Sequence, residues 1–294
     1  MSILESLSTS AAAGAVTRGC LYVVATPIGN LGDMTPRAIE TLQSVDLIAA
    51  EDTRHSARLM SHFDIKTPLI AYHDHSDEGR TLKIVENLIG GKSVALISDA
   101  GTPLVSDPGY RLVRLARDAN VQVVPIPGAC ALIAGLSASG LPSDRFSFEG
   151  FLPAKQVARL KTLEALAADA RTLIFYEAPH RVLDALLDMK TAFGGEREVV
   201  MAREITKTFE TIKGGPLSEL VDWVAADANQ QRGEIALLVK GAAIQDSQEM
   251  TPEQARVMKI LLEDLPVKQA AAIGAQITGL KKNHLYQWAL EQEK

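Results

Sequence analysis

The sequence has very few cysteines and no long apolar run, and each shortage excludes a class of protein. Cys20 and Cys130 are the only two cysteines among 294 residues, too few for a disulfide framework or a cysteine-based metal site. Both stand among apolar or small residues, which favours reduced, buried thiols. No apolar run reaches the roughly 18 residues of a membrane span. We therefore expect a soluble cytoplasmic protein without membrane contact.

The chain also lacks a surplus of positive charge. Its formal net charge is −6, the wrong sign for a protein that holds nucleic acid along its whole surface. One window, residues 265–290, has no acidic residue and carries Lys268, Lys281 and Lys282. Residues 1–18 lack a basic start before an apolar block, so we expect a flexible tail rather than a secretory signal. Any contact with nucleic acid is predicted to be local.

Short β-branched runs alternate with amphipathic stretches from residue 21 onward. Five such repeats, from LYVVATPI to VQVVPIP with the helix after it, predict a parallel sheet covered by helices. We assign residues 19–141 to this N-terminal α/β domain. Ligands of such sheets bind at the carboxyl ends of the strands. The loops that follow the five strands are therefore expected to share one functional rim.

A second unit follows a connector, SGLPSDRFSFEGFLPAK (139–155), that marks a domain boundary. In residues 150–241, runs such as TLIFYE, REVVMARE and GEIALLVKG predict a second α/β domain with a mixed or antiparallel sheet. A polar linker after Gly241 leads to a helical domain over 251–294, which includes a helix-turn-helix pattern with its turn at Thr278-Gly279. The fold class is thus two α/β domains followed by a small helical domain.

The loop ISDAGTPLVSDPG (97–109) has two glycines and two prolines. Glycine removes the side chain and proline fixes φ, so such a loop offers its backbone groups to a ligand. The alternative to a ligand-binding loop is a plain connection between a strand and a helix. Such a connection usually needs only about 2 to 6 residues, which is shorter than this loop. The loop lacks the Lys-Ser/Thr of a phosphate loop and the GxGxxG of a dinucleotide site.

Motifs along the whole chain carry a family resemblance. In order they are TPIGNLGDMTPRA, AAEDTRHS, HDHS, SDAGTPLVSDPG, PIPGACA, GLPSDRFSFEGFLP, LIFYEAPHR, MAREITKTFE and GEIALLVKG. With these motifs the chain resembles the small-subunit ribosomal RNA methyltransferase I family of the tetrapyrrole methylase superfamily. The resemblance implies a homodimer that binds S-adenosylmethionine (SAM) between two α/β domains. It also implies 2′-O-methylation of a cytidine in the decoding region of 16S rRNA, within the small ribosomal subunit.

The resemblance also implies which residues line the SAM pocket. From the first domain these are Pro27, Asp99, Gly101, Thr102, Pro103, Ala129, Cys130 and Ala131, and from the second Phe175, Tyr176, Met201, Ala202, Ile235 and Ala236. For three of them, the sequence favours a place in the hydrophobic core as much as one in the pocket: Phe175, Met201 and Ile235. The first loop, TPIGNLGD, departs from the GxGPGD of porphyrin methylases and so favours an RNA substrate over the alternative of a tetrapyrrole.

Methyl transfer to a hydroxyl needs collinear reacting atoms and gains from a base. Glu51, Asp52 and His73 are the candidate bases, and Arg54 is a candidate to orient phosphate or carboxylate. The structural alternative for this segment is a helix N-cap by Asp52 or Thr53. The sequence leaves the identity of the base open.

Two rival functions come from other motifs. HDHS (73–76), with Asp52 and His55, resembles the ligands of a metal-dependent phosphohydrolase, although the other loops add few ligands and we expect no metal. A non-enzymatic RNA-binding adaptor is suggested by Lys281, Lys282 and Tyr286 in the tail. The alternative for that tail is a solvated helix that caps the dimer.

Overall fold

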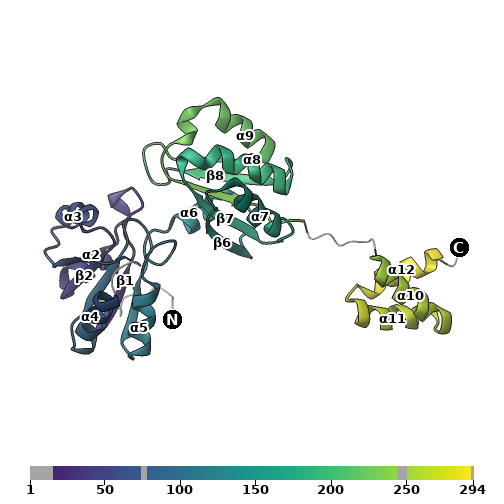
Figure 1. The fold of residues 1–294 in the computed structure, drawn as a ribbon, viewed down its shortest axis with the longest axis horizontal. Helices are drawn as coiled ribbons and strands as arrows, with labels where there is room; N and C mark the ends of the chain where they lie inside the picture. The colour runs from purple at the N-terminus through teal and green to yellow at the C-terminus, as the bar shows by residue number, and fades with distance from the viewer. Residues whose placement is uncertain (1–15, 74–77, 244–249, 293–294) are drawn as a thin grey trace, which may run out of the picture. The chain divides into compact units, whose positions relative to one another are not determined.

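The structure is a computed structural model that describes residues 16–73, 78–243 and 250–292. The chain divides between Ala242 and Ala243 into two compact units, which are described separately below (Figure 1). Most of the expected N-terminal tail and of the linker after Gly241 lies outside the described residues.

The first sheet of the larger unit is entirely parallel, as predicted. Its strands run in the order β3-β2-β4-β1-β5. The buried apolar runs of β1 and β4 lie at its centre, where both faces are covered. The strand bounds are β1 Cys20–Val24, β2 Leu47–Ala50, β3 Leu69–Ala71, β4 Val94–Ile97 and β5 Gln122–Ile126.

Helices cover both faces of this sheet. On one face, α2 (Pro36–Ser44) and α3 (Thr53–His62) pack with one apolar cluster. On the other, α4 (Glu78–Ile89) and α5 (Tyr110–Asp118) pack with a second cluster. A short 3-10 helix, η2 (Leu31–Asp33), follows β1. Cys20, Tyr22 and Val24 of β1 belong to the first cluster and Leu21 to the second, as the alternation of side chains along a strand requires.

The second sheet is mixed, in the order β6-β7-β10-β8-β9. Only β6 and β7 run parallel, and the other neighbours are antiparallel. The bounds are β6 Phe146–Phe151, β7 Thr172–Glu177, β8 Glu198–Arg203, β9 Thr211–Pro216 and β10 Ile235–Val239. One face packs on three helices, α7 Gln156–Leu166, α8 Val182–Phe193 and α9 Leu217–Ala226. Two 3-10 helices, η3 Pro179–Arg181 and η4 Ala228–Gln231, complete this half.

Helix α6 (Ala131–Ser139) departs from the predicted arrangement. It follows β5 and was expected to cover the first sheet, but Leu132 and Leu136 pack against Ile174 and Leu238 of the second sheet. Figure 1 shows α6 beside the second sheet. The helix is apolar on most of its surface, so its sequence does not say which sheet it covers.

The expected connector over 139–155 was wrong in one respect, because it contains strand β6. This strand lies at the edge of its sheet, contains Gly150, and is half-exposed along most of its length. Glycine weakens a strand pattern and edge strands lack a continuous apolar run. These two properties hid the strand in the sequence.

Within residues 250–292, the C-terminal unit contains three helices, α10 Pro252–Asp264, α11 Val267–Thr278 and α12 Lys282–Gln292. A capping box between Thr251 and Gln254 begins α10. Gly279 ends α11 with a φ of +74°, the left-handed conformation that favours glycine at this position. In the part of the chain described here, no helix is both long and apolar enough to cross a membrane.

Candidate functional site

Three loops meet at the carboxyl edge of the first sheet because β4, β1 and β5 are neighbours. Thr26, after β1, and Gly101, after β4, exchange two backbone hydrogen bonds of 2.8 and 3.0 Å. The Thr102 hydroxyl donates to the carbonyl of Ala129, after β5, at 3.0 Å. The loop over 98–109 is therefore tied to both of its neighbours.

Several residues of these loops hold unusual backbone conformations. Gly101 has a φ of +83°, and Leu104 and Ser106 have φ values of +74° and +63°. Positive φ is uncommon in residues other than glycine. Non-glycine residues keep this conformation only where the surrounding structure holds them in it, and they are found most often at functional sites. On the opposite side of the site, Glu204 and Thr206 have φ values of +52° and +68°.

A cavity of about 340 Å³ lies between these loops and the second sheet. This volume falls in the usual range of ligand pockets, and small residues dominate the walls. From the first half of the unit the lining comprises Ile28, Ala100, Gly101, Thr102, Val105, Ser106, Asp107, Cys130 and Ala131. From the second half it comprises Phe151, Tyr176, Glu177, Ala178, Pro179, Ala202, Ile205, Gly233, Glu234, Ile235 and Ala236.

Many of the residues expected to bind SAM share this cavity. Gly101, Thr102, Cys130, Ala131, Tyr176, Ala202, Ile235 and Ala236 all line it. Pro27, Asp99, Pro103 and Ala129 belong to the same loops but are not among the lining residues. The side chains of Phe175 and Met201 lie in the core beneath α8 and α9, on the other face of the second sheet. At these two positions, the side chain belongs to the core. Ile235 belongs to the same core cluster, although it also lines the cavity.

Asp107 and Phe151 are two cavity residues that were not predicted from the sequence, although both stand in the family motifs. Asp107 is part of SDAGTPLVSDPG, and Phe151 is part of GLPSDRFSFEGFLP. Both line the cavity. Two sequence features could have indicated these residues. Asp107 is a carboxylate in the loop after a strand whose carboxyl end is expected to bind a ligand, and Phe151 is an aromatic residue next to a glycine.

Asp107 has the most perturbed environment among the acidic residues of the cavity. Burial, chiefly, raises the pKa of its carboxyl from 3.8 to about 6, and the negative charges of Glu51 and Asp99 add to the effect. A hydrogen bond with Ser98 opposes the rise. A carboxylate with a pKa near neutrality in a cavity is a candidate proton acceptor.

The candidate bases predicted from the sequence lie on the rim outside this cavity. Asp52 caps α3 by accepting hydrogen bonds from the backbone N–H groups of Arg54 and His55. These bonds, that of Arg54 first, lower the pKa of the Asp52 carboxyl, which makes it a weaker base. The structural alternative of an N-cap thus describes the geometry of Asp52. Arg54 is exposed.

Glu51 and His73 also stay outside the cavity lining. Glu51 accepts a hydrogen bond from the backbone N–H of Asp99 at 3.3 Å, while Asp99 accepts one from the backbone N–H of Asp52 at 3.0 Å. His73 is exposed. The carboxyl ends of β2 and β4 therefore share a chain of polar contacts, but it lies beside the cavity.

The two halves of the larger unit are joined at the cavity by polar contacts. The backbone N–H of Leu132 donates to the Tyr176 hydroxyl at 3.0 Å, so a strand of the second sheet holds the start of α6. The Thr206 hydroxyl contacts the Asp33 carboxylate, which links the β8–β9 loop to η2. Lys207 packs closely over Gly29, where an added Cβ would stand 2.5 Å from its side chain. The second half thus contacts the TPIGNLGD motif at Gly29 and Asp33, although both residues remain exposed.

The residues of the possible metal site are only partly described. Asp74 and His75 of the HDHS motif lie outside the described residues. Within residues 16–73, 78–243 and 250–292, no group of three or more His, Cys, Asp or Glu side chains is placed to hold a metal ion.

The candidate RNA-binding residues of the tail lie on one helix and just before it. Lys282 and Tyr286 belong to α12, and Lys281 directly precedes it. All three are exposed. The core of this unit is made instead by Met258, Ala271 and Leu285 with their neighbours. Tyr286 thus lies outside the set of residues that pack this core.

Comparison with known proteins identifies relatives over nearly the full chain. The family described as Tetrapyrrole (Corrin/Porphyrin) Methylases matches residues 20–221, and the RsmI C-terminal HTH domain matches residues 248–293. The Ribosomal RNA small subunit methyltransferase I of Pseudomonas aeruginosa is 58% identical over 95% of this chain and 99% of its own length. That of Vibrio cholerae is 57% identical over 92% and 94%.

Solved structures share the fold of the larger unit. The uroporphyrin-III-C-methyltransferase of Thermus thermophilus has a TM-score of 0.53 at 20% identity, covering 76% of this chain and 94% of that one. A diphthine synthase has a TM-score of 0.56 at 14% identity, covering 75% and 89%. These two proteins have different names and one architecture, so the fold by itself does not specify the methyl acceptor.

Proposed function

The chain belongs to the tetrapyrrole methylase family, in its ribosomal RNA small subunit methyltransferase I branch, and we propose its reaction and the roles of the residues that carry it out. The proposed reaction is transfer of the SAM methyl group to the ribose 2′-oxygen of a cytidine in the decoding region of 16S rRNA. The observation that carries the proposal is the cavity between the loops that follow the first sheet and the second half of the unit, with small residues on its walls.

The cavity residues fit a donor that is held by backbone groups and close contact. An added Cβ at Gly101 would stand 3.2 Å from Ile28, which also lines the cavity, so a side chain at position 101 would crowd this wall. Ala131, Ala202 and Ala236 leave similar room on the other walls. When bound, SAM supplies a methyl group already activated by the sulfonium charge. We assign its binding to these small residues together with Thr102 and Cys130.

The proton of the ribose hydroxyl needs an acceptor inside the cavity. Asp107 lines the cavity, whereas Glu51, Asp52 and His73 do not. With a pKa near 6, its carboxylate is ionised at neutral pH and can accept a proton as the oxygen forms its bond to the methyl carbon. A positioned base typically contributes about 10²- to 10⁴-fold to the rate. We therefore propose Asp107 as the general base.

Recognition of RNA beyond the reacting nucleotide is assigned to two surfaces. Lys281, Lys282 and Tyr286 lie exposed in a window without acidic residues, where lysines can contact phosphate and the tyrosine can stack on an exposed base. Arg54 lies exposed on the rim of the first sheet and can contact a phosphate of the RNA. The active form is proposed to be a cytoplasmic homodimer that acts on the small ribosomal subunit.

Transfer of labelled methyl groups tests the proposed function. Purified protein and methyl-labelled SAM are incubated with small ribosomal subunits, naked 16S rRNA, large subunits, or a tetrapyrrole acceptor. We expect label in 16S rRNA, in a dinucleotide that resists alkaline hydrolysis because its 2′-oxygen is methylated. Label on a nucleobase or a tetrapyrrole, or no transfer to rRNA in any form, would refute the proposal. Light scattering of the same preparation tests the homodimer.

A further inference from the structure

Phe151 is an exposed aromatic residue on the wall of the cavity. The residue is 56% exposed, although it lines a cavity whose other walls are mainly small residues. The chain is poor in aromatic residues, which make up 5% of it. The position of this ring depends on two local features, one in the strand that carries it and one beside it.

The first feature is a bulge in β6. Phe148 pairs with Ile174, but Gly150 pairs with Phe175 and Phe151 with Tyr176, so Glu149 and Gly150 together oppose one residue of β7. Without the extra residue, the alternation would place Phe151 on the face that packs against α8. With it, Phe151 lies on the same face as Tyr176 and the cavity. Gly150 makes this turn with a φ of +67°, and bulges next to active sites commonly redirect one side chain.

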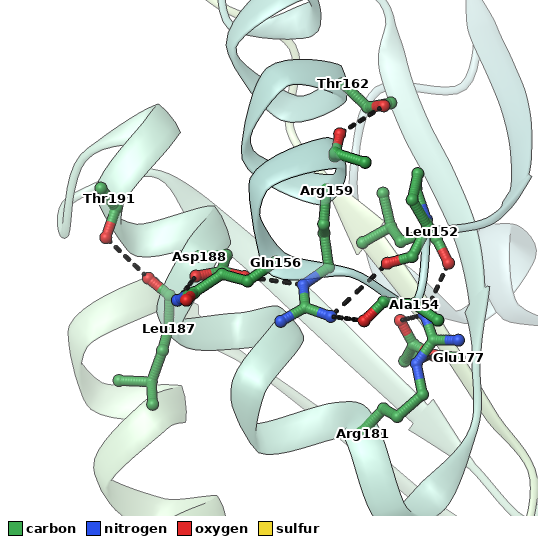
Figure 2. Close-up of polar contacts among 12 residues, drawn as sticks. Leu152, Ala154, Gln156, Arg159, Thr162, Glu177, Arg181, Leu187, Asp188 and Thr191 are labelled. Atoms are coloured by element: carbon green, nitrogen blue, oxygen red, sulfur yellow. Dashed lines mark hydrogen bonds and ion pairs between the residues drawn. The ribbon is translucent and has the colours of Figure 1, made fainter.

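The second feature is a pair of arginines that fix the chain just after Phe151, shown in Figure 2. Arg181 donates to the carbonyl of Leu152 and pairs with Glu177. Arg159 donates to the carbonyls of Pro153 and Ala154 at 3.5 and 3.3 Å. Arg159 is itself held by a buried ion pair with Asp188 at 2.7 Å. The backbone beside Phe151 is thus anchored while its ring faces the cavity.

The ring of Phe151 also contacts a second aromatic ring. Tyr176 contacts it edge to face, with ring centroids 5.8 Å apart, and contacts Phe148 in the same way at 4.8 Å. Because Tyr176 meets Phe151 edge to face, the contact covers only part of the ring. A rigid, supported and half-exposed aromatic ring is the group on which unpaired bases stack.

Phe151 lies next to the loop that carries the proposed base. An added Cβ at Gly150 would stand 3.7 Å from the Ser106 hydroxyl, and Ser106 directly precedes Asp107. A base on Phe151 would therefore bring its ribose to the side of the cavity where Asp107 lies. The small residues assigned to SAM lie on the remaining walls.

We propose that Phe151 is the stacking platform for the base of the target nucleotide, which leaves its helix or loop and enters the cavity. This inference rests on the proposed function. Enzymes that modify nucleotides commonly turn the target out of its stack and hold it against aromatic side chains. The adenine of SAM is the competing occupant, and the experiment separates the two.

The test compares Phe151→Ala, Phe151→Leu and Phe151→Tyr with the unchanged protein. Leucine keeps most of the apolar volume but has no aromatic face, and tyrosine keeps that face. Methyl transfer to small subunits is measured at saturating SAM, and calorimetry measures affinity for SAM and for its demethylated product. We expect alanine and leucine to raise the KM for subunits by roughly 10- to 100-fold, tyrosine to stay within about threefold, and SAM affinity to stay unchanged.

Three results would overturn the inference. A parallel loss of SAM affinity in the alanine and leucine variants would assign Phe151 to the adenine. Equal activity of the leucine and unchanged proteins would show that no base stacks there. If the unchanged protein binds SAM but transfers no methyl group to rRNA, the proposed function fails first and the inference fails with it. Matching thermal unfolding of the variants excludes loss of fold as the cause of any change.

Discussion

Replacing Asp107 by asparagine should stabilise the protein and impair its reaction. The folded protein raises the pKa of this carboxyl from 3.8 to about 6, so ionised Asp107 opposes folding at neutral pH. A shift of about two pKa units corresponds to about 3 kcal/mol. Partial exposure to solvent reduces this figure, and we expect a gain of about 1–2 kcal/mol in the free energy of unfolding of Asp107→Asn at pH 8.

The pH dependence of this gain has a definite sign. A carboxyl with a raised pKa in the folded state contributes stability below its unfolded pKa and loses that contribution as the pH rises through its folded value. The gain from asparagine should therefore be full above about pH 6 and should shrink as the pH falls toward 4. Asp118→Asn is the matched control, because Asp118 lies exposed in an ion pair with Arg114 and should change stability little.

The same variant tests the catalytic role. We expect kcat to fall about 100-fold or more, because asparagine cannot accept the hydroxyl proton. The affinity for SAM should stay within about threefold of the unchanged protein. In the unchanged protein, kcat/KM should rise with pH through about 6 and then level off. Thermal unfolding at pH 8 and pH 4.5, together with single-turnover methyl transfer, measures these effects.

Three outcomes would contradict the reasoning on Asp107. An unchanged unfolding temperature at both pH values would mean that the carboxyl is not buried as described. A large loss of affinity for SAM with little loss for its uncharged product would assign Asp107 to the sulfonium charge instead of the hydroxyl proton. Full activity of the variant would exclude it as the base.

Four further predictions concern other parts of the chain. Gly150→Ala should lower the free energy of unfolding by about 1–2 kcal/mol in urea titrations, because its φ of +67° is costly for alanine, whereas a gain in stability would argue against the bulge. Arg159→Met should cost about 3–5 kcal/mol by leaving Asp188 buried and unpaired, and the double variant Arg159→Met, Asp188→Leu should recover much of this loss if the ion pair is the cause. Replacing Lys281 and Lys282 by alanine should reduce the slope of log affinity for RNA against log salt by about one to two without altering SAM binding, and an unchanged slope would remove the tail from RNA recognition. Methyl transfer to prefolded subunits should survive chelation of divalent ions, and restoration of lost activity by a single divalent ion would reinstate a metal role.

The sequence predicted the first sheet well because its strands carry their own signal. β1 and β4 are short apolar runs buried on both faces, and each is followed by an amphipathic helix. β6 was missed because an edge strand with a glycine bulge has neither a continuous apolar run nor a regular alternation. The sequence also did not predict which sheet α6 packs against, because a helix that is apolar on most of its surface can cover either sheet.

The candidate site was only partly predictable for a related reason. Motifs indicated the loops that line the cavity, but which face of a strand a residue occupies depends on register and bulges. Phe175 and Met201 therefore have their side chains in the core, whereas Phe151 reaches the cavity. The pKa of Asp107 depends on burial and on Glu51 and Asp99, and Glu51 is distant in the sequence. Such an environment forms only when the chain has folded.

The attachment of α6 to the second sheet has a consequence for anyone who wishes to recombine members of this family. By its place in the chain the helix closes the first half, yet Leu132 and Leu136 are buried by the second. A chimera joined after Ser139 would pair α6 with a foreign sheet and would misplace Cys130 and Ala131 on the cavity wall. A junction before Cys130 keeps the helix with the sheet it covers. The exchangeable module for altering the methyl acceptor thus begins one helix earlier than the order of strands suggests.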